Sequence, residues 1–387
     1  MFVYLDNSAT TKQYEEVNES ILQMMKFDFG NPSSLHRLGI NAEKAVKEAR
    51  KNIAQSIGAN NDEIFFTSCG TESDNMALFG VSEARKRRGN KIIVSEIEHP
   101  AVLEPCKKLD KMGFNIQYIG VDTKGFVNIN ALEEAIDDKT ILVSVMHVNN
   151  EVGSIQSLDK IKELINNYNK KSGTEILFHT DAVQSYGKLP VQTSYADLIT
   201  LSGHKIHGPK GIGVLYIKKG INIEPYIYGG MQERGMRSGT ENVPAIAGIG
   251  KASEICCKSL KTRYNTMTNV KKYLLEGIKN EIPDIKVNSP YENCISSVLN
   301  ISFLGVRGEV LLHTLENSDI YVSTGSACSS NKKANSHVLR AMGLSDKEIE
   351  GAVRFSFSEF NTIEEMDYVL HHLKKGVSQF RKLGSFR

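Results

Sequence analysis

The chain has 387 residues, of which 40% are hydrophobic and 24% are charged, so it is long enough to bury a large core and to form more than one lobe. Its 47 basic side chains nearly balance its 45 acidic ones, which leaves a formal net charge of +2. Such an even balance gives no electrostatic reason to expect direct binding to nucleic acid or to a membrane.

The N-terminus and the hydropathy pattern indicate a cytoplasmic protein. Residues 1–6 lack the charged and apolar regions of a secretory signal, and nowhere do 18 apolar residues run together. The cysteines show no paired CxxC spacing, so we expect neither a metal site nor a disulfide framework. The natural expectation is an enzyme that acts on a small molecule.

A strand-like run at 64–66 leads into the turn Thr67-Ser68-Cys69-Gly70-Thr71 and then into a helix-like segment. A strand, a turn of small residues and a helix N-terminus together present free backbone N–H groups to an anion. The turn is therefore a candidate phosphate site, although an ordinary turn between a strand and a helix has the same pattern.

Helix-like and strand-like segments alternate through the first two thirds of the chain. Residues 42–57 and 158–168 have helical apolar spacing, whereas 91–94 and 141–145 are short apolar runs typical of strands. This alternation predicts an α/β fold in which helices cover a mostly parallel sheet.

Two polar turns follow buried strands further along the chain. An apolar run at 176–178 leads into His179-Thr180-Asp181, and another at 198–201 leads into Ser202-Gly203-His204-Lys205. Enzymes of the α/β class place their chemistry at such strand ends, so we expect Asp181 and Lys205 to share one crevice. A reactive lysine, an acid for a pyridine nitrogen and a phosphate cradle are the three parts of a pyridoxal phosphate site.

After about residue 255 the pattern changes. A long amphipathic stretch is followed by a strand-like run at 298–303 and by a helix that opens near residue 361, where Thr362 and Glu365 have the spacing of a capping box. We therefore expect a large cofactor-binding domain over 15–255 and a smaller α+β domain over 256–387.

Taken in order, these segments resemble the cysteine desulfurases of the NifS/IscS type, within the class V aminotransferase superfamily. The resemblance covers nearly the whole chain and rests on residues 4–11, 30–36, 98–100, 147–153, 181–184, 202–205, 237–242, 323–330 and 353–356. It implies fold type I of the pyridoxal-phosphate-dependent transferases. It also implies that residues 1–14 join the small domain and that the protein is a homodimer.

The resemblance implies a role for each matching residue near the cofactor ring. Lys205 would hold pyridoxal 5′-phosphate covalently and later take a substrate proton as general base. Asp181 would pair with the pyridinium nitrogen, Gln184 would donate to the phenolic oxygen, and His99 would stack on the ring. Taken singly, His99 could instead be a turn residue and Gln184 a helix-start residue.

Two further groups of residues would bind anions. The cofactor phosphate would be held by backbone and side-chain groups of Gly70, Thr71, Ser202 and His204, together with Thr240 of the other subunit, although Thr240 could instead cap a helix. The carboxylate of the substrate would be received by Asn31, Asn150 and Arg354, of which Asn150 is also expected to contact the cofactor and Arg354 offers bidentate geometry. Arg237 is a weaker candidate for the site wall.

Cys328 decides between reaction classes. It lies in the polar, small-residue segment 323–335, which predicts a mobile surface loop. The neighbouring Lys332 and Lys333 favour the thiolate, which is the nucleophilic form of cysteine. The resemblance implies that Cys328 attacks the sulfur of L-cysteine, so that L-alanine is released and Cys328 becomes a persulfide.

The protein that accepts this sulfur stays open. The chain stops at Arg387, short of the tail with which iron–sulfur assembly members dock their scaffold protein, so a tRNA-thiolation enzyme is an equally good acceptor. Selenocysteine lyase and class V aminotransferase activities are the alternatives, and the Cys328 thiol argues against an aminotransferase. Cys69 also departs from the Gly-Ala-Thr that is usual at the phosphate turn, which puts in doubt any positive φ there.

Overall fold

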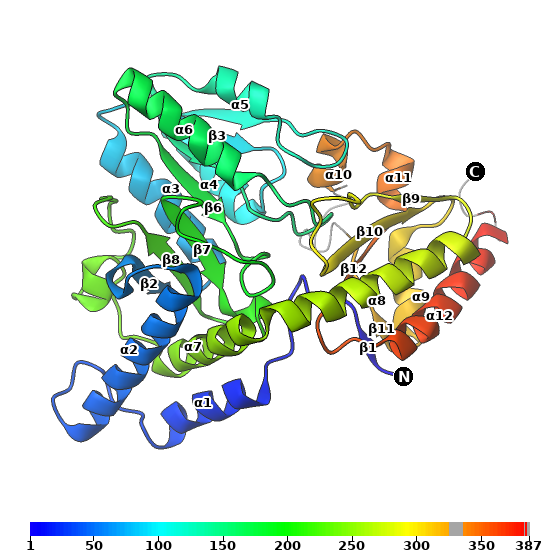
Figure 1. Cartoon of the computed structure of the whole chain (residues 1–387), viewed down its shortest axis with the longest axis horizontal. Helices are drawn as coiled ribbons and strands as arrows, with labels where there is room; N and C mark the ends of the chain where they lie inside the picture. Colours follow the sequence, from blue (N-terminus) through cyan, green and yellow to red (C-terminus); the bar gives the residue numbers. More distant parts are fainter. Residues whose placement is uncertain (325–335, 383, 385–387) are drawn as a thin grey trace.

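A seven-stranded sheet forms the centre of the larger of two lobes in the computed structural model, which describes residues 1–324, 336–382 and 384 (Figure 1). The strand order is β2-β8-β7-β6-β5-β3-β4, and β8 alone runs antiparallel to its neighbours within this sheet. The strands are β2 (Ile64–Thr67), β3 (Lys91–Ser95), β4 (Asn115–Ile119), β5 (Thr140–Ser144), β6 (Leu177–Asp181), β7 (Leu198–Ser202) and β8 (Gly213–Ile217). The predicted α/β class with a mostly parallel sheet is confirmed.

Helices cover both faces of this sheet, which is why its inner strands are apolar along their length. Successive residues enter opposite cores: Ile93 and Val143 pack with α1, α2, α6 and α7, whereas Ile92 and Leu142 pack with α3 and α4. The helices are α1 (Glu15–Lys26), α2 (Arg37–Ile57), α3 (Gly70–Arg85), α4 (Pro100–Lys111), α5 (Ile129–Ala135), α6 (Leu158–Ser172) and α7 (Val243–Lys258), with 3-10 turns η1 (Asn61–Glu63), η2 (Gly203–Lys205) and η3 (Gln232–Gly235).

The smaller lobe has its own core around an antiparallel sheet of order β12-β10-β9 and a parallel pair of β1 with β11. Val3 and Leu5 of the N-terminus lie in this core with residues from the last third of the chain. Its elements are β1 (Val3–Tyr4), α8 (Leu260–Glu281), β9 (Ile285–Val287), β10 (Val298–Phe303), α9 (Gly308–Glu316), β11 (Ile320–Tyr321), α10 (His337–Ala341), α11 (Asp346–Glu350), β12 (Ala352–Ser356) and α12 (Ile363–Lys382). The domain boundaries near residues 14 and 255 stay a prediction.

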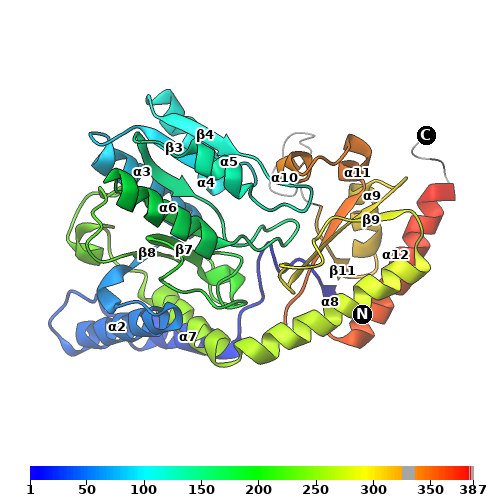
Figure 2. The ribbon, with the colours of Figure 1, turned by 45° about the horizontal axis from the view of Figure 1, so that its top comes forward.

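The two lobes are joined along one side by α7 and α8, which run end to end (Figure 2). The predicted capping box at the start of α12 is confirmed, because the Glu365 N–H donates to Thr362 Oγ1 at 3.2 Å and the Thr362 N–H donates to Glu365 Oε2 at 3.1 Å. Across the residues that the structure describes, no helix is both long and apolar enough to cross a membrane.

Strand β6 is longer than the apolar run that predicts it. The sequence places His179, Thr180 and Asp181 in a turn, but all three are buried strand residues. The polar His179 ring can be buried because its two nitrogens contact Ser144 Oγ at 2.9 Å and Thr200 Oγ1 at 3.0 Å. Polar partners on neighbouring strands thus carry the strand as far as Asp181.

Candidate active site

The predicted cofactor residues meet at one edge of the large sheet. Since β8 is antiparallel to both β2 and β7, those two strands are parallel to each other and to β6. Their carboxyl ends therefore lie on the same edge, and they lead into Gly70, Ser202 and Asp181. This is the edge at which open α/β sheets bind ligands.

Lys205 ends the short turn η2 that follows β7, and its side chain is half-buried. Its Nζ donates to the carbonyl oxygens of Ser8 at 2.5 Å and Ala9 at 2.6 Å. The Ser8 oxygen also accepts a hydrogen bond from Gln184 Nε2 at 3.0 Å. The N-terminal segment therefore brings Lys205 and Gln184 to one carbonyl group.

Asp181 is buried at the end of β6, where its Oδ1 accepts the Val183 N–H at 2.8 Å. Burial raises the pKa of Asp181 to about 6, against the opposing effects of the Val183 hydrogen bond and the Lys205 charge. Asp74 of α3 is also buried, and burial together with the charge of Asp181 raises its pKa well above the usual range. Of the two carboxyl groups, Asp181 is the one at the carboxyl end of β6, on the sheet edge that also carries Ser202.

The predicted phosphate cradle has an unsatisfied buried group. Ser202 is 1% exposed, and its hydroxyl oxygen has no hydrogen-bond partner among the described residues. The first turn of α3 lies beside it, since a Cβ added to Gly70 would be 3.6 Å from Ser202 Cβ and 3.0 Å from Val183 Cγ2. An anion between the N-terminus of α3 and Ser202 would accept hydrogen bonds from the free N–H groups of the helix and from the Ser202 hydroxyl. Thr71 is exposed next to Gly70.

The cysteine in this turn does not disturb it. Cys69 has φ −175° and ψ 171°, which is extended backbone that any residue adopts. No positive φ is required there, so the doubt raised by the departure from Gly-Ala-Thr is removed.

Two half-buried histidines face the same region and are neutral near pH 7. Burial, followed by the charge of Lys205, lowers the pKa of His99 to about 4 and that of His204 to about 3. His99 caps α4 by accepting the Ala101 N–H on Nδ1 at 3.1 Å, and His204 Nδ1 contacts Thr10 Oγ1 at 3.3 Å. A neutral imidazole can stack on a ring or accept a proton.

Arg354 of β12 reaches from the small lobe to the large one. Its Nη2 lies 2.8 Å from Asp6 Oδ1, and its Nη1 donates to the Asn150 carbonyl at 3.1 Å. Arg354 is buried, and its Nε has no hydrogen-bond partner within the described part of the chain. A buried guanidinium with a spare donor is suited to a carboxylate ligand.

Cys328 lies outside the described residues, but the described residues on either side of its segment are anchored beside this site. Ser323 exchanges two backbone hydrogen bonds with Arg354, at 3.1 and 2.7 Å. At the other side, Ser336 Oγ donates to Glu151 Oε2 at 2.5 Å and His337 Nε2 donates to the Glu98 carbonyl at 3.0 Å. The last described residues before the Cys328 segment therefore lie next to Arg354, and the first described residues after it lie next to His99.

Asn31 and Thr240 are not joined to the other site residues by a described contact. Asn31 is exposed, and its Oδ1 accepts from its own turn, from the Ser33 N–H at 3.0 Å and Oγ at 2.7 Å. Thr240 is exposed, and Asn242 rather than Thr240 caps α7. Arg237 pairs with Glu72 of the first turn of α3 at 2.9 Å.

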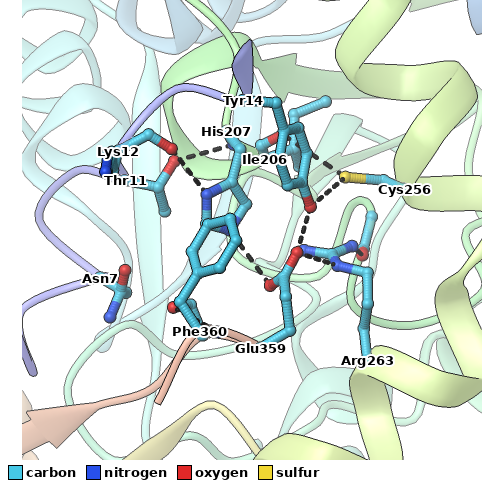
Figure 3. A network of polar contacts seen from close by, with 12 residues as sticks. Asn7, Thr11, Lys12, Tyr14, Ile206, His207, Cys256, Arg263, Glu359 and Phe360 are labelled. Atoms are coloured by element: carbon cyan, nitrogen blue, oxygen red, sulfur yellow. Dashed lines mark hydrogen bonds and ion pairs between the residues drawn. The ribbon is translucent and has the colours of Figure 1, made fainter. Parts of the chain in front are cut away.

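A buried network that the sequence analysis missed holds the Lys205 turn (Figure 3). Glu359 accepts hydrogen bonds from Tyr14 Oη and from Arg263 Nε at 2.7 Å, and lies 3.3 Å from His207 Nε2. The other ring nitrogen of His207 contacts the Lys12 carbonyl at 2.7 Å. The sequence holds no motif that joins Glu359 to Arg263, which lie 96 positions apart, so only packing reveals the network.

Glu359→Gln is expected to destabilise the protein. Burial alone would raise the pKa of Glu359. The hydrogen bond from His207 and the charge of Arg263 outweigh burial and hold this pKa well below its usual range. A carboxylate with such a lowered pKa stabilises the folded protein at any pH above its unfolded pKa of about 4.3. This stabilisation is lost progressively as the pH falls below that value. The substitution leaves Arg263 buried without its anion, so we expect a loss of about 3 kcal/mol at pH 7.

Thermal unfolding of both proteins at several pH values measures this effect. The gap between the wild-type and Glu359→Gln midpoints should narrow below pH 4, because the wild type then loses the same contribution. Glu281→Gln, which removes an exposed partner of Lys374, is the matched control and should cost less than about 1 kcal/mol. Equal midpoints for wild type and Glu359→Gln at pH 7 would contradict the assigned role.

Comparison with known proteins gives a consistent result. A family model described as aminotransferase class-V matches residues 3–369. Cysteine desulfurase IscS from Dictyoglomus turgidum is 42% identical over 387 residues, which cover 100% of this chain and 97% of that protein. The namesake from Methanosarcina thermophila is 43% identical over 98% of this chain and 93% of its own length.

Solved structures agree with the sequence comparisons. A NifS-like protein superposes with a TM-score of 0.92 at 40% identity, over 98% of this chain and 100% of its own. The apo structure of a cysteine desulfurase from Thermococcus onnurineus NA1 superposes with a TM-score of 0.86 at 27% identity, over 98% of this chain and 95% of its own.

Proposed function

This chain belongs to the class V aminotransferase family and, within it, to the cysteine desulfurases, and we propose that it uses pyridoxal 5′-phosphate to move the sulfur of L-cysteine onto Cys328. The observation that carries the proposal is the convergence of Lys205, the buried Asp181 and the unpaired Ser202 hydroxyl at one sheet edge. A lysine, an acid and an anion site in that arrangement fit the aldehyde, the ring nitrogen and the phosphate of this cofactor.

The residues around the ring would hold it as follows. Asp181 would bind the ring nitrogen, Gln184 Nε2 would donate to the phenolic oxygen, and His99 would lie against the ring face. The phosphate would be bound by Gly70, Thr71, Ser202 and His204, with Thr240 from a second subunit. When bound, pyridoxal phosphate supplies an electron-withdrawing ring that stabilises negative charge on the adjacent substrate carbon.

The reaction then depends on groups of the chain itself. Arg354, with its spare Nε donor, and the Asn150 side chain would hold the carboxylate of L-cysteine. Lys205 would take the proton from the substrate α-carbon, because its Nζ is held at the same edge as Asp181. His99, which is neutral, is placed to pass protons within the site.

Sulfur transfer would be carried out by the Cys328 thiolate. It attacks the substrate sulfur, so that a sulfur–sulfur bond forms while the carbon–sulfur bond breaks and its electron pair stays with the carbon skeleton. Protonation of that carbon releases L-alanine, and the chain keeps the sulfur as a persulfide. We propose that a protein acceptor then takes it, either a scaffold for iron–sulfur clusters or a tRNA-thiolation enzyme.

Joint measurement of the two products tests this function. Purified protein loaded with pyridoxal phosphate and supplied with L-cysteine and a reducing agent should release alanine and sulfide in equal amounts. Amino transfer to a keto acid would identify an aminotransferase instead. Turnover of L-selenocysteine without turnover of L-cysteine would identify a selenocysteine lyase.

We also propose that two copies of the chain form a dimer. Exposed apolar side chains gather at the end of α1 and in the loop that follows, at the end of the large lobe away from the small one (Figure 1). They are Leu22, Met25, Phe27, Phe29 and Leu35, and Tyr228 and Met231 are exposed shortly before Thr240. A second copy would cover such apolar surface and place Thr240 near its phosphate site.

Sedimentation tests the dimer. Wild type should sediment as a dimer, whereas Phe27→Glu together with Phe29→Glu should weaken association. Tyr291→Glu replaces an equally exposed aromatic of the small lobe and should leave the dimer intact. A wild-type monomer with full cofactor occupancy would rule out a role for Thr240 across subunits.

A further inference from the structure

Lys188 is a buried lysine that the reaction described above does not use. Its side chain is 3% exposed, and its Nζ donates to Gln184 Oε1 at 3.3 Å. Buried lysines usually pair with a carboxylate, because an unpaired buried charge is costly. Here the described hydrogen-bond acceptor is the neutral amide of Gln184, a residue expected to contact the cofactor.

The contacts with Lys188 and with the Ser8 carbonyl require the same orientation of the Gln184 amide. An ammonium group can only donate and a backbone carbonyl can only accept, so Oε1 must face Lys188 and Nε2 must face the Ser8 carbonyl. The same carbonyl accepts from Lys205 Nζ. A continuous chain of contacts therefore runs from Lys188 through Gln184 and Ser8 to Lys205.

The backbone around Lys188 is held in place. The Lys188 N–H donates to the Ser185 carbonyl at 2.9 Å, and the carbonyl of the preceding residue, Gly187, accepts a hydrogen bond from Arg263 Nη1. Arg263 is itself fixed by Glu359 in the network of Figure 3. The peptide group between Gly187 and Lys188 is thus hydrogen-bonded through both its N–H and its carbonyl, which fixes the backbone from which the Lys188 side chain extends.

Charged groups of both signs face this chain of contacts. Burial, followed by the charges of Lys205 and Arg263, lowers the pKa of Lys188 to about 7, and Cys256 and Glu359 oppose this effect. Lys205 faces Asp181, His99, His204 and Lys188, of which the two histidines are neutral near pH 7. Lys188 is therefore a second amine whose charge bears on the reactive lysine.

We propose that Lys188 is a positioning residue that orients Gln184 toward the phenolic oxygen of the cofactor and makes the nitrogen of Lys205 less basic. The inference rests on the proposed function, because it concerns the bond between Lys205 and pyridoxal phosphate. Loss of the Gln184 donor and loss of a nearby cation should both raise the pKa of that nitrogen, because each change stabilises its protonated form.

The test is a pH titration of the visible absorbance of protein loaded with pyridoxal phosphate, without substrate. Lys188→Met keeps the length of the side chain but removes its donor and its charge. We expect its titration midpoint to lie higher than that of wild type by about half a unit or more, and its affinity for the cofactor to fall several-fold. Lys188→Arg, which retains both donor and charge, should restore most of both properties.

Two controls separate this role from a general loss of stability. Lys91→Met removes another buried lysine, which bonds to the Ala135 carbonyl and Asp137 at the start of β3, the end of that strand away from the site. It should leave the midpoint unchanged. In a Gln184→Leu background, Lys188→Met should shift the midpoint less than it does in the wild type, because the contact with Gln184 is already lost and only the charge of Lys188 is removed.

Several results would overturn the inference. One is a Lys188→Met protein with the midpoint and cofactor affinity of wild type, and another is full additivity with Gln184→Leu. If Lys188→Met does not fold, Lys188→Arg gives the test instead. A titration midpoint for Lys188→Arg that is shifted as far as the midpoint of Gln184→Leu would also overturn the inference. A wild-type protein without any visible absorbance would instead contradict the proposed function itself.

Discussion

Lys205→Ala protein is expected to lose the visible absorbance of covalently held pyridoxal phosphate and to form alanine from L-cysteine about 10³-fold more slowly or worse. The effect is large because one nitrogen would do two things, holding the cofactor and removing the substrate proton. Lys205 Nζ is held by two carbonyl oxygens at the edge where Asp181 and Ser202 lie. Spectra and alanine measurements on the two purified proteins check this result.

Lys210→Ala is the matched control for this substitution. Lys210 lies in the same turn region but is exposed, so its loss should leave both the spectrum and the rate of alanine formation near those of wild type. Borohydride reduction followed by peptide mapping identifies the modified lysine. Reduced cofactor on a different lysine in the Lys205→Ala protein would show that Lys205 is the wrong residue.

Cys328→Ala protein is expected to bind pyridoxal phosphate normally, to form no persulfide and to release alanine at least about 10³-fold more slowly, since removal of a catalytic nucleophile can cost about 10⁶ in kcat. Ser323 and Ser336, on either side of the Cys328 segment, are anchored at Arg354 and Glu151. The described residues that flank the Cys328 segment are therefore held in the region where the substrate carboxylate is proposed to bind. Mass spectrometry of the protein after L-cysteine, with alanine measured in parallel, gives both quantities.

The described cysteines provide the controls. Cys257 is exposed, and Cys294 is half-buried with Lys271 Nζ 3.1 Å from its sulfur. Both Cys257→Ala and Cys294→Ala should retain the persulfide and the alanine rate. Unchanged alanine formation in Cys328→Ala, or transferred sulfur found on Cys294, would contradict the assignment of Cys328 as nucleophile.

The local features of this protein can be read from its sequence. Apolar runs followed by small or polar residues predict the ends of β2 and β7 to within a residue, and so the segments that carry Gly70 and Lys205, whereas β6 continues beyond its apolar run to Asp181. The capping box of Thr362 with Glu365 is also present as predicted. These signals involve residues within a few positions of one another, where backbone geometry limits the choices. The family follows from many such segments in a fixed order.

The partners of buried polar groups cannot be read from the sequence in this way. Gln184 and Lys205 meet at the Ser8 carbonyl across 176 and 197 positions, and the Glu359 network joins both lobes. Such contacts depend on strand order and on how the lobes pack, because a buried donor takes whichever acceptor the fold brings within reach. The sequence by itself determined the elements, the reactive residue types and the family. The tertiary structure decided which of them meet, since the fold brings the buried Lys188 to Gln184 and Gln184 to the Ser8 carbonyl.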